Sequence, residues 1–325
     1  MRAHRKPIFT LLLVTPVLTE LLSGNLAPSA FLNPIVPLFL STVGYGFPIL
    51  LLREFSIRKR MGIPGLVCLG LAYGIFNEGI LAKTFYMAVK VPINTFDGYG
   101  RVFGISVPWA VTISTWHALH AFLYPVALVY YLFPEHCDAT WLTRKNRNWI
   151  SGITITVATL VFFTHSKETA ASNPAHFIIM LGSMALLIWA GAKLPSTAVL
   201  GRQGLFKTKT ILMGALGFLG LFLVPVIMAA MKIPPVLFHG YYILAFAWII
   251  RRLRQIRAVP VTTLLLFALG DDIMVALFGA IGTIGQGSIQ KLIAELFFLG
   301  AFTWLIVRLR KQSAQRHPAE ETRTQ

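Results

Sequence analysis

The feature that most constrains this chain is a series of long apolar stretches separated by short segments that contain most of the charges. A helix needs about 20 apolar residues to cross a lipid bilayer. By this measure the chain has about ten candidate spans, near residues 8–23, 35–52, 64–89, 106–133, 149–165, 175–192, 210–231, 234–250, 261–283 and 289–307. The pattern predicts an all-α membrane protein built as a bundle of about ten transmembrane helices.

The composition leaves little material for a water-facing surface. Of the 325 residues, 56% are hydrophobic and 13% are charged, whereas a soluble domain carries about 25% charged residues. We therefore expect residues 1–311 to form a single polytopic transmembrane domain. The polar segment 312–325 has few apolar residues and is predicted to be a disordered cytoplasmic tail.

The basic residues predict the orientation. The formal net charge is +17, and it is concentrated in short clusters between apolar stretches, such as RKNR at 144–147 and RRLRQIR at 251–257. If the N-terminus is inside and ten spans alternate, the inside segments hold about 23 of the 29 Lys and Arg residues. Both termini are therefore predicted to be cytoplasmic. This distribution also argues against nucleic acid as a partner, because a nucleic-acid binder gathers its basic residues on one soluble domain.

Ionisable side chains inside the spans are the best pointers to function. A charge at the centre of a bilayer costs at least about 2.5 kcal/mol, so such residues are rare and usually functional. The candidates are Glu20, Glu78, Lys83, His117, His120, His239, Asp271, Asp272 and Glu295. Lys83 lies toward the outer side, where its long side chain can reach the interface.

The third and fourth spans place one carboxylate and two imidazoles at a similar depth. Glu78 lies near the middle of the third span, directly after Asn77. His117 and His120 lie in the fourth span, and their spacing of three residues puts them on one face of a helix. If that face meets the third span, the three side chains converge.

Three interpretations of this group stay open. His117, His120 and Glu78 can act as ligands to a divalent metal that generates a hydroxide nucleophile. Glu78 can instead carry a proton, with the histidines as its partners. Finally, the group can be structural, with a neutral Glu78 hydrogen-bonded to histidine.

A Glu in one span, a basic residue after it and histidines in a later span resemble the CAAX-protease and bacteriocin-processing group of intramembrane enzymes. That group has Glu-Glu-x-x-x-Arg, then Phe-x-x-x-His and His-x-x-x-Asn or Asp. This chain has Asn77-Glu78, Lys83 five residues further on, and His117 after Ile113. The resemblance implies a hydrolase or transferase with Glu78 as general base or ligand. TELLSGN, LLREF and AYGIFNEG are also similar to uncharacterised prokaryotic membrane proteins, which implies a prokaryotic inner or plasma membrane.

A second polar centre is predicted in the ninth span. Asp271 and Asp272 are adjacent, so their side chains point about 100° apart on a helix. One of them is expected to carry a proton or a cation, or to pair with His239 in the eighth span. Glu20, in the outer half of the first span, is expected to line an outward-facing cavity. Glu295 is expected to pair with Lys291, one helical turn before it.

The glycine-rich helix faces allow two interpretations. Gly70 and Gly74 form a Gly-x-x-x-Gly pair, and Gly214, Gly217 and Gly220 follow a spacing of three residues. Such faces let helices approach closely. They predict either internal packing or a homodimer.

The predicted function is a secondary transporter of a small solute, coupled to protons or a cation through Glu78, Asp271 or Asp272. Glu20, Asn77 and His239 are further candidates for the substrate or ion pathway. The alternatives are an intramembrane hydrolase or transferase, metal-dependent or based on Glu78 and the histidines and acting on a lipidic substrate, and a non-catalytic subunit of a membrane complex. In each case the lipid bilayer is a partner.

Overall fold

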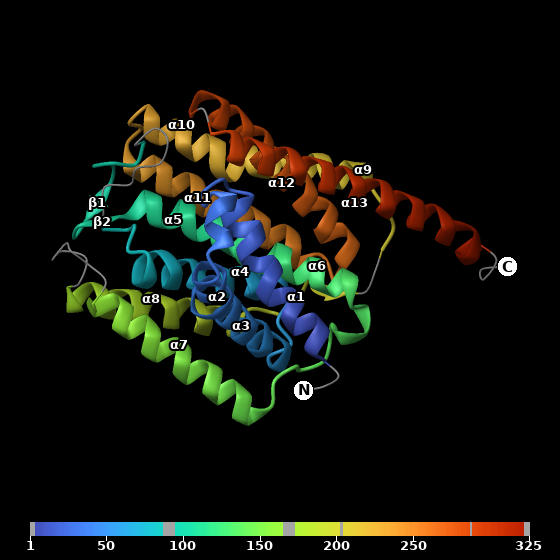
Figure 1. Ribbon diagram of the computed structural model, residues 1–325, viewed down its shortest axis with the longest axis horizontal. Helices are drawn as coiled ribbons and strands as arrows, with labels where there is room; N and C mark the ends of the chain where they lie inside the picture. The colour runs from blue at the N-terminus through green and yellow to red at the C-terminus, as the bar shows by residue number, and fades with distance from the viewer. Residues whose placement is uncertain (1–3, 87–94, 165–172, 202–203, 287, 322–325) are drawn as a thin grey trace.

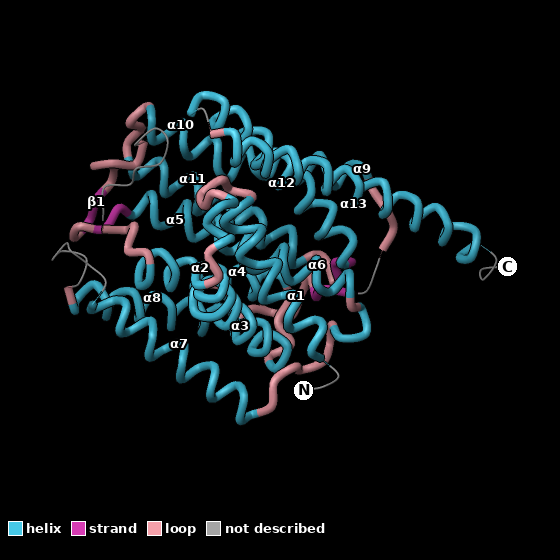
Figure 2. Tube along the Cα trace, in the orientation of Figure 1, coloured by secondary structure: helices cyan, strands magenta, loops and turns pink. Residues whose placement is uncertain are grey.

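The structure is a computed structural model that describes residues 4–86, 95–164, 173–201, 204–286 and 288–321. The described residues are mostly helical (Figure 2). Within them, ten helical rods follow one another along the chain, and several of the rods contain a π-helical segment, labelled η. The rods are α1 (Arg5–Pro16) with η2 (Val17–Leu21); α2 (Ile35–Phe39), η4 (Leu40–Gly44) and α3 (Gly46–Arg58); α4 (Ile63–Gly74) with η5 (Ile75–Leu81); α5 (Val107–Trp116), η6 (His117–Leu123) and α6 (Tyr124–Leu132); α7 (Arg144–Thr164); α8 (Pro174–Lys193); α9 (Thr208–Phe218), η9 (Leu219–Leu223) and α10 (Val224–Ala230); α11 (Pro235–Arg254); α12 (Val261–Gln286); and α13 (Ile289–Glu321).

The helices confirm the prediction of a helical membrane protein. Within the described residues, seven helical stretches are long and apolar enough to cross a membrane. The α4–η5 rod lies in the interior, with 72% of its apolar window buried, whereas only 11% of the window in α11 is buried. The ribbon shows α7, α10 and α13 at the periphery of the bundle (Figure 1). Seven spans are therefore supported by length and hydropathy, and the count of ten stays a prediction.

At each end of the bundle, short connecting segments contact one another. At one end, β3 (Val199–Gly201) pairs in parallel with β4 (Ala258–Pro260), and the Ile63 amide donates to the Ala198 carbonyl. At the other end, β1 (Arg101–Val102) pairs with β2 (Ile105–Ser106) in an antiparallel hairpin, and the Tyr99 hydroxyl donates to the Ile233 carbonyl. Two short 3-10 turns, η3 (Pro28–Leu32) and η7 (Pro134–His136), complete the connections.

Exposed tryptophans mark the end of the bundle that carries the basic clusters. Four of them are about 60% exposed, and each lies within two turns of basic residues at the end of its helix, a single Lys193 in the case of Trp189: Trp149, Trp189, Trp248 and Trp304. The guanidinium of Arg252 lies 5.6 Å from the centre of the Trp248 ring. Trp residues concentrate at membrane interfaces, so this is the pattern expected of an end that lies at a membrane interface. Which side of the membrane it faces remains the prediction made from the charges.

Proline explains two of the π-helical segments. Pro125 follows η6, and Pro225 follows η9. A proline has no N–H to donate to the carbonyl four residues before it, and its ring crowds that carbonyl. A widened turn relieves both problems. The sequence therefore predicts a distortion in the fourth span at Pro125, and the structure has a π-helical turn there.

The glycine faces are occupied inside the protein. A Cβ atom added at Gly70 would lie 2.5 Å from the Ala118 Cα, and one at Gly74 would lie 2.4 Å from the Ser114 Cα. Gly214 on α9 and Gly270 on α12 approach each other's helix even more closely, with added Cβ atoms 1.9 Å from a facing carbonyl oxygen. Internal packing is thus observed. The predicted homodimer remains untested, but these glycine faces already pack against other helices of the same chain and cannot form its interface.

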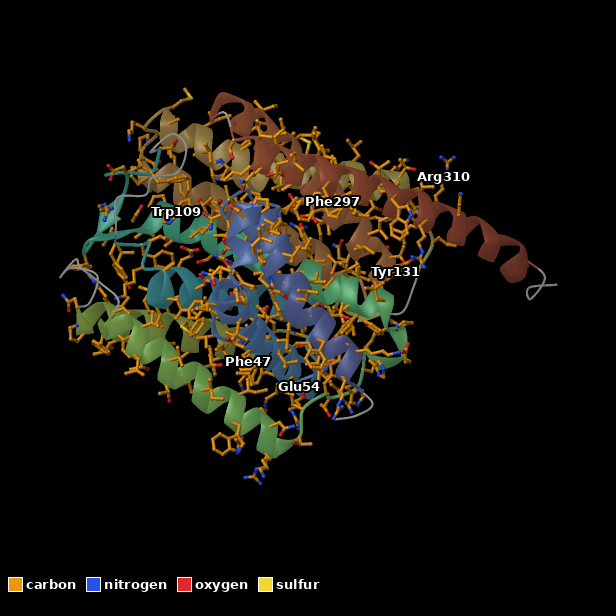
Figure 3. All side chains as sticks on the ribbon, viewed as in Figure 1. Phe47, Glu54, Trp109, Tyr131, Phe297 and Arg310 are labelled. Carbon is orange, nitrogen blue, oxygen red and sulfur yellow. The ribbon has the colours of Figure 1, made fainter. Side chains whose placement is uncertain are left out.

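The C-terminal helix is longer than the sequence predicts. Helix α13 runs to Glu321, and it extends beyond the bundle (Figure 1); the disordered cytoplasmic tail over 312–325 stays a prediction. The stretch KQSAQ that follows Arg310 contains residues of good helix propensity, which continue the helix already formed by the apolar residues before them. Arg310 itself is exposed and points away from the bundle (Figure 3).

Candidate functional site

The polar residues singled out in the first four spans lie on π-helical segments. Glu20 is on η2, Asn77 and Glu78 are on η5, and His117 and His120 are on η6. These segments are short: η2 and η5 end their rods, and η6 lies between α5 and α6. π-Helical turns are rare and occur frequently at functional sites. Their coincidence with the buried ionisable residues marks the interior of the bundle as the candidate site.

Glu78 and His117 form a direct pair. The Nε2 atom of His117 lies 2.8 Å from Oε1 of Glu78. The Glu78 side chain is 11% exposed and the His117 side chain is 2% exposed. The second carboxylate oxygen of Glu78 accepts a hydrogen bond of 2.5 Å from the Thr84 hydroxyl. The Trp109 indole N–H donates to that hydroxyl over 2.9 Å, and Trp109 stands near the start of α5 (Figure 3). The pair is therefore fixed on the Glu78 side, and its hydrogen bonds lead toward the end that carries the β1–β2 hairpin.

Two tyrosines lie beside this pair. The rings of Tyr45 and Tyr73 have their centres 6.0 and 5.6 Å from that of His117. Tyr45 donates a short hydrogen bond to Glu20. Tyr73 donates to the Gly44 carbonyl over 2.7 Å and accepts from the Asn77 amide over 2.8 Å. Glu20 and Asn77 are thus linked to the surroundings of His117 through the rings of Tyr45 and Tyr73.

His120 does not join the Glu78 pair. Its ring stacks on Trp116 at 3.8 Å, and its Nε2 lies 3.4 Å from an oxygen of Asp271 and 3.4 Å from an oxygen of Asp272. The predicted convergence of Glu78, His117 and His120 is therefore wrong. On an α-helix, residues three apart lie roughly 60° apart, but the wider turn of η6 separates them further, so the two histidines face different helices.

The structure does not bring the predicted metal ligands Glu78, His117 and His120 together. No three His, Cys, Asp or Glu side chains within the described residues are placed to hold one metal ion. The residues named as ligands are divided between two clusters, because His117 faces α4–η5 and His120 faces α12.

Two predicted ion pairs are also replaced by other contacts. The half-buried His239 lies against the Phe238 ring, while Asp271 accepts a hydrogen bond of 2.5 Å from the Tyr124 hydroxyl. Glu295 is fully buried, and neither of its carboxylate oxygens has a hydrogen-bond partner among the described residues. A Cβ atom added at Gly279 would lie 2.6 Å from Glu295 Oε1. The glycine makes room for this carboxyl, and no Glu295–Lys291 ion pair within 4 Å occurs among the described residues.

Lys83 is buried instead of reaching the interface. Its side chain is 1% exposed, and its ammonium donates to the Phe162 carbonyl and lies 4.8 Å from the centre of the Phe162 ring. The chain leaves η5 at Leu81, so Lys83 lies in the turn after the helix and folds back against α7.

Sequence reasoning missed the hydroxyl-bearing partners and the indole beside them: Tyr45, Tyr73, Thr84, Trp109 and Tyr124. A simple spacing signal was present for two of them. Tyr73 precedes Asn77 by four residues, and Tyr124 follows His120 by four residues, which is the spacing of neighbours on a helix. Polar residues one turn from a buried ionisable residue are therefore worth including in such searches.

The apolar helices and the buried ionisable clusters define a polytopic integral membrane protein. The sequence profile of an uncharacterised membrane protein family matches residues 9–312, and the chain belongs to that family. Comparisons with curated proteins and with solved structures return no match. The match to the family supports a membrane location and leaves the activity open.

Proposed function

We propose that this protein is a secondary transporter of a small solute, coupled to protons through the Glu78–His117 pair. The observation that carries the proposal is the 2.8 Å contact between Glu78 Oε1 and His117 Nε2 in the interior of the bundle. A hydrogen must lie between a carboxylate oxygen and an imidazole nitrogen at this separation. The pair carries one negative charge when the imidazole is neutral and no net charge after one more proton binds.

This change of charge has a large consequence in a low-dielectric interior. A net charge buried in a membrane protein is expensive, so protonation favours arrangements that keep the pair away from water, and deprotonation favours hydration. A group of this kind biases a protein between two conformations. Because Glu78 retains 11% exposure while His117 has 2%, the carboxylate side is where exchange with water is expected.

The π-helical segments support the same proposal. η5 and η6, which carry the pair, lie within rods that a widened turn makes less regular. Gly70 and Gly74 allow α4 to approach the α5–η6 rod at backbone distance. Closely packed helices with irregular turns are suited to small sliding or rocking motions. Alternating access in transporters uses such motions around a site near the bilayer midplane.

An intramembrane hydrolase is the second candidate, and one observation favours it. His117 Nδ1 is buried and has no hydrogen-bond partner among the described residues, while Glu78 holds the opposite nitrogen. A histidine oriented by a carboxylate is a common general base. This candidate requires a nucleophile or a water molecule at Nδ1. It predicts hydrolysis of a lipidic or peptide substrate that is lost in His117→Gln.

The test uses purified protein in proteoliposomes with an acid-outside pH gradient. Uptake is measured for a panel of radiolabelled amino acids, sugars, nucleosides and organic acids. The proposal predicts that at least one solute accumulates, and that a protonophore abolishes its accumulation. Glu78→Gln is expected to lose accumulation but to keep solute exchange across the membrane without a gradient. Accumulation that persists in Glu78→Gln would contradict the role of the pair. Glu135→Gln is the matched control, because that carboxylate is 64% exposed on a connecting turn.

A further inference from the structure

A second buried cluster lies on the far side of η6 from the Glu78–His117 pair. It consists of His120 on η6, Tyr124 on α6, and Asp271 and Asp272 on α12, all with at most 4% exposure. The helices that supply these residues pack directly against each other, since α12 contacts α6. The proposed function makes no use of this cluster.

The cluster contains more hydrogen-bond acceptors than donors. His120 Nδ1 lies 3.2 Å from the Trp116 carbonyl oxygen, and a carbonyl can only accept, so the hydrogen is on Nδ1. In the neutral ring, His120 Nε2 then carries a lone pair and can only accept a hydrogen bond. It lies 3.4 Å from Asp271 Oδ2 and 3.4 Å from Asp272 Oδ1. The Tyr124 hydroxyl supplies a hydrogen to Asp271 Oδ2 alone.

Three atoms of the cluster lack a hydrogen-bond partner in the part of the chain that the structure describes. They are His120 Nε2, Asp271 Oδ1 and Asp272 Oδ1. Two ionised carboxylates and an imidazole lone pair at these distances would repel one another, and buried uncompensated charge is expensive. The arrangement is stable only if a cation lies within it. Since no three ligands are placed for a metal ion among the described residues, the cation that fits is a proton.

Within the described ranges, the surrounding helices offer no alternative positive charge at this point. His117 is the next titratable group on η6, and it is held by Glu78. Other titratable side chains on the elements that pack against η6 and α12 are engaged elsewhere or lie at the helix ends, among them Glu20 with Tyr45 on η2 and α3, Tyr73 with Gly44 on α4, Tyr130 with Arg53 on α6 and α3, Glu295 beside Gly279 on α13, and Lys209 in the first turn of α9.

We propose that His120, Asp271 and Asp272 form a proton-binding site, in which at least one proton is shared between the imidazole Nε2 and the two carboxyl groups. The proton converts an arrangement of acceptors into one with a donor, and Tyr124 provides the second donor. Trp116, stacked on the imidazole, and Phe222, 5.8 Å from it between ring centres, close the site to lipid. The site binds its proton whether or not the protein transports a solute.

Infrared difference spectroscopy on the full chain in nanodiscs tests this site. A protonated carboxyl group has a C=O stretching band that is separate from the bands of a carboxylate. The wild-type protein is expected to show such a band at about pH 7, and Asp272→Asn or Asp271→Asn should remove or shift one component of it. Glu295→Gln, Glu78→Gln, Glu20→Gln and Glu54→Gln are the controls that account for the other buried carboxyl groups among the described residues.

The measurement distinguishes a bound proton from a bound metal cation. If His120→Gln folds, it should move the same component, because the hydrogen-bond partner of the carboxyl changes while the carboxyl remains. A spectrum without any component that depends on Asp271, Asp272 or His120 at about pH 5 to 9 would overturn the proposal. Loss of the component in sodium chloride but not in choline chloride would show a metal cation in place of the proton and would also overturn it.

Discussion

Two buried charged clusters of this protein differ in how completely their hydrogen bonds are satisfied. At the interface end, Arg53 is fully buried and makes five hydrogen bonds, which match the five N–H groups of a guanidinium. Its acceptors are Tyr130 Oη, Glu54 Oε1, and the carbonyls of His136, Cys137 and Ala139. The Trp141 ring lies 3.7 Å from the guanidinium carbon. This cluster fastens the connection after α6 to α3, where Glu54 lies (Figure 3).

The membrane-interior cluster is built in the opposite way. His120, Asp271 and Asp272 are as deeply buried as Arg53, yet three of their polar atoms have no hydrogen-bond partner among the described residues. Burial alone therefore does not separate structural from functional residues in this protein. The Arg53 guanidinium has an acceptor for each of its N–H groups, and Glu54 Oε2, which lacks a hydrogen bond among the described residues, lies 3.9 Å from the Arg58 guanidinium. The unpaired acceptors of the His120 cluster have no such cation beside them among the described residues, so that cluster needs a ligand.

The largest expected effect is on the Arg53 cluster. Arg53→Met removes the guanidinium and leaves Glu54 buried without its partner, which should destabilise the fold by about 3–5 kcal/mol. Arg58→Met is the matched control: its side chain is 41% exposed and 3.9 Å from Glu54, and its loss should cost less than about 1 kcal/mol. Unfolding followed by tryptophan fluorescence in detergent measures both. Equal losses in the two variants would show that the Arg53 network does not stabilise the protein.

The packing that positions η6 should give the next largest effect. Gly74→Ala places a Cβ atom 2.4 Å from the Ser114 backbone and should destabilise the fold by about 1–3 kcal/mol. Gly182→Ala serves as the control, because an added Cβ atom meets nothing within 4 Å among the described residues. The same unfolding assay compares them. If Gly74→Ala is as stable as Gly182→Ala, α4 and the α5–η6 rod are further apart than described.

The interior acidic cluster should respond to pH where the Arg53 cluster does not. Asp272→Asn replaces a carboxyl by a neutral group of the same shape, so it should change stability by less than about 1 kcal/mol at neutral pH. The wild type should lose about 2–4 °C in melting temperature from about pH 6 to about pH 9 relative to this variant, because the buried cluster of the wild type has two carboxyl groups to ionise and that of the variant has only Asp271. Parallel melting curves of the two proteins across this range would contradict the shared proton.

The smallest effect is expected at the N-terminal end. Burial and the neighbouring His136 lower the pKa of His4, whose Nδ1 lies 3.2 Å from that of His136. A lowered pKa means that the folded state takes up this proton less readily than the unfolded chain, so the contribution is complete above about pH 6.5 and is lost as the pH falls. Because the pair is only partly buried, His4→Gln should alter the acid-side melting temperature by under about 2 °C. A larger shift would show that this contact holds α1 in place.

The sequence predicts the helical membrane class and most helix positions because apolar length and polarity are local properties. It predicts the Glu78–His117 contact, because both residues are placed by depth in consecutive spans. It fails for His120, since a π-helical turn changes the direction of a side chain without changing the residue spacing. It also fails for Glu295 and Lys83, whose buried positions depend on Gly279 and on Phe162, residues distant in the sequence.

Proton movement measured with a pH-sensitive dye inside proteoliposomes tests the central claim most directly. With a solute from the transport panel added outside and no initial pH gradient, the wild type should acidify the interior as the solute enters. Glu78→Gln and His117→Gln should abolish this acidification, whereas Glu135→Gln should keep it at the wild-type rate. Solute-driven acidification that persists at the wild-type rate in Glu78→Gln would contradict proton coupling through the Glu78–His117 pair.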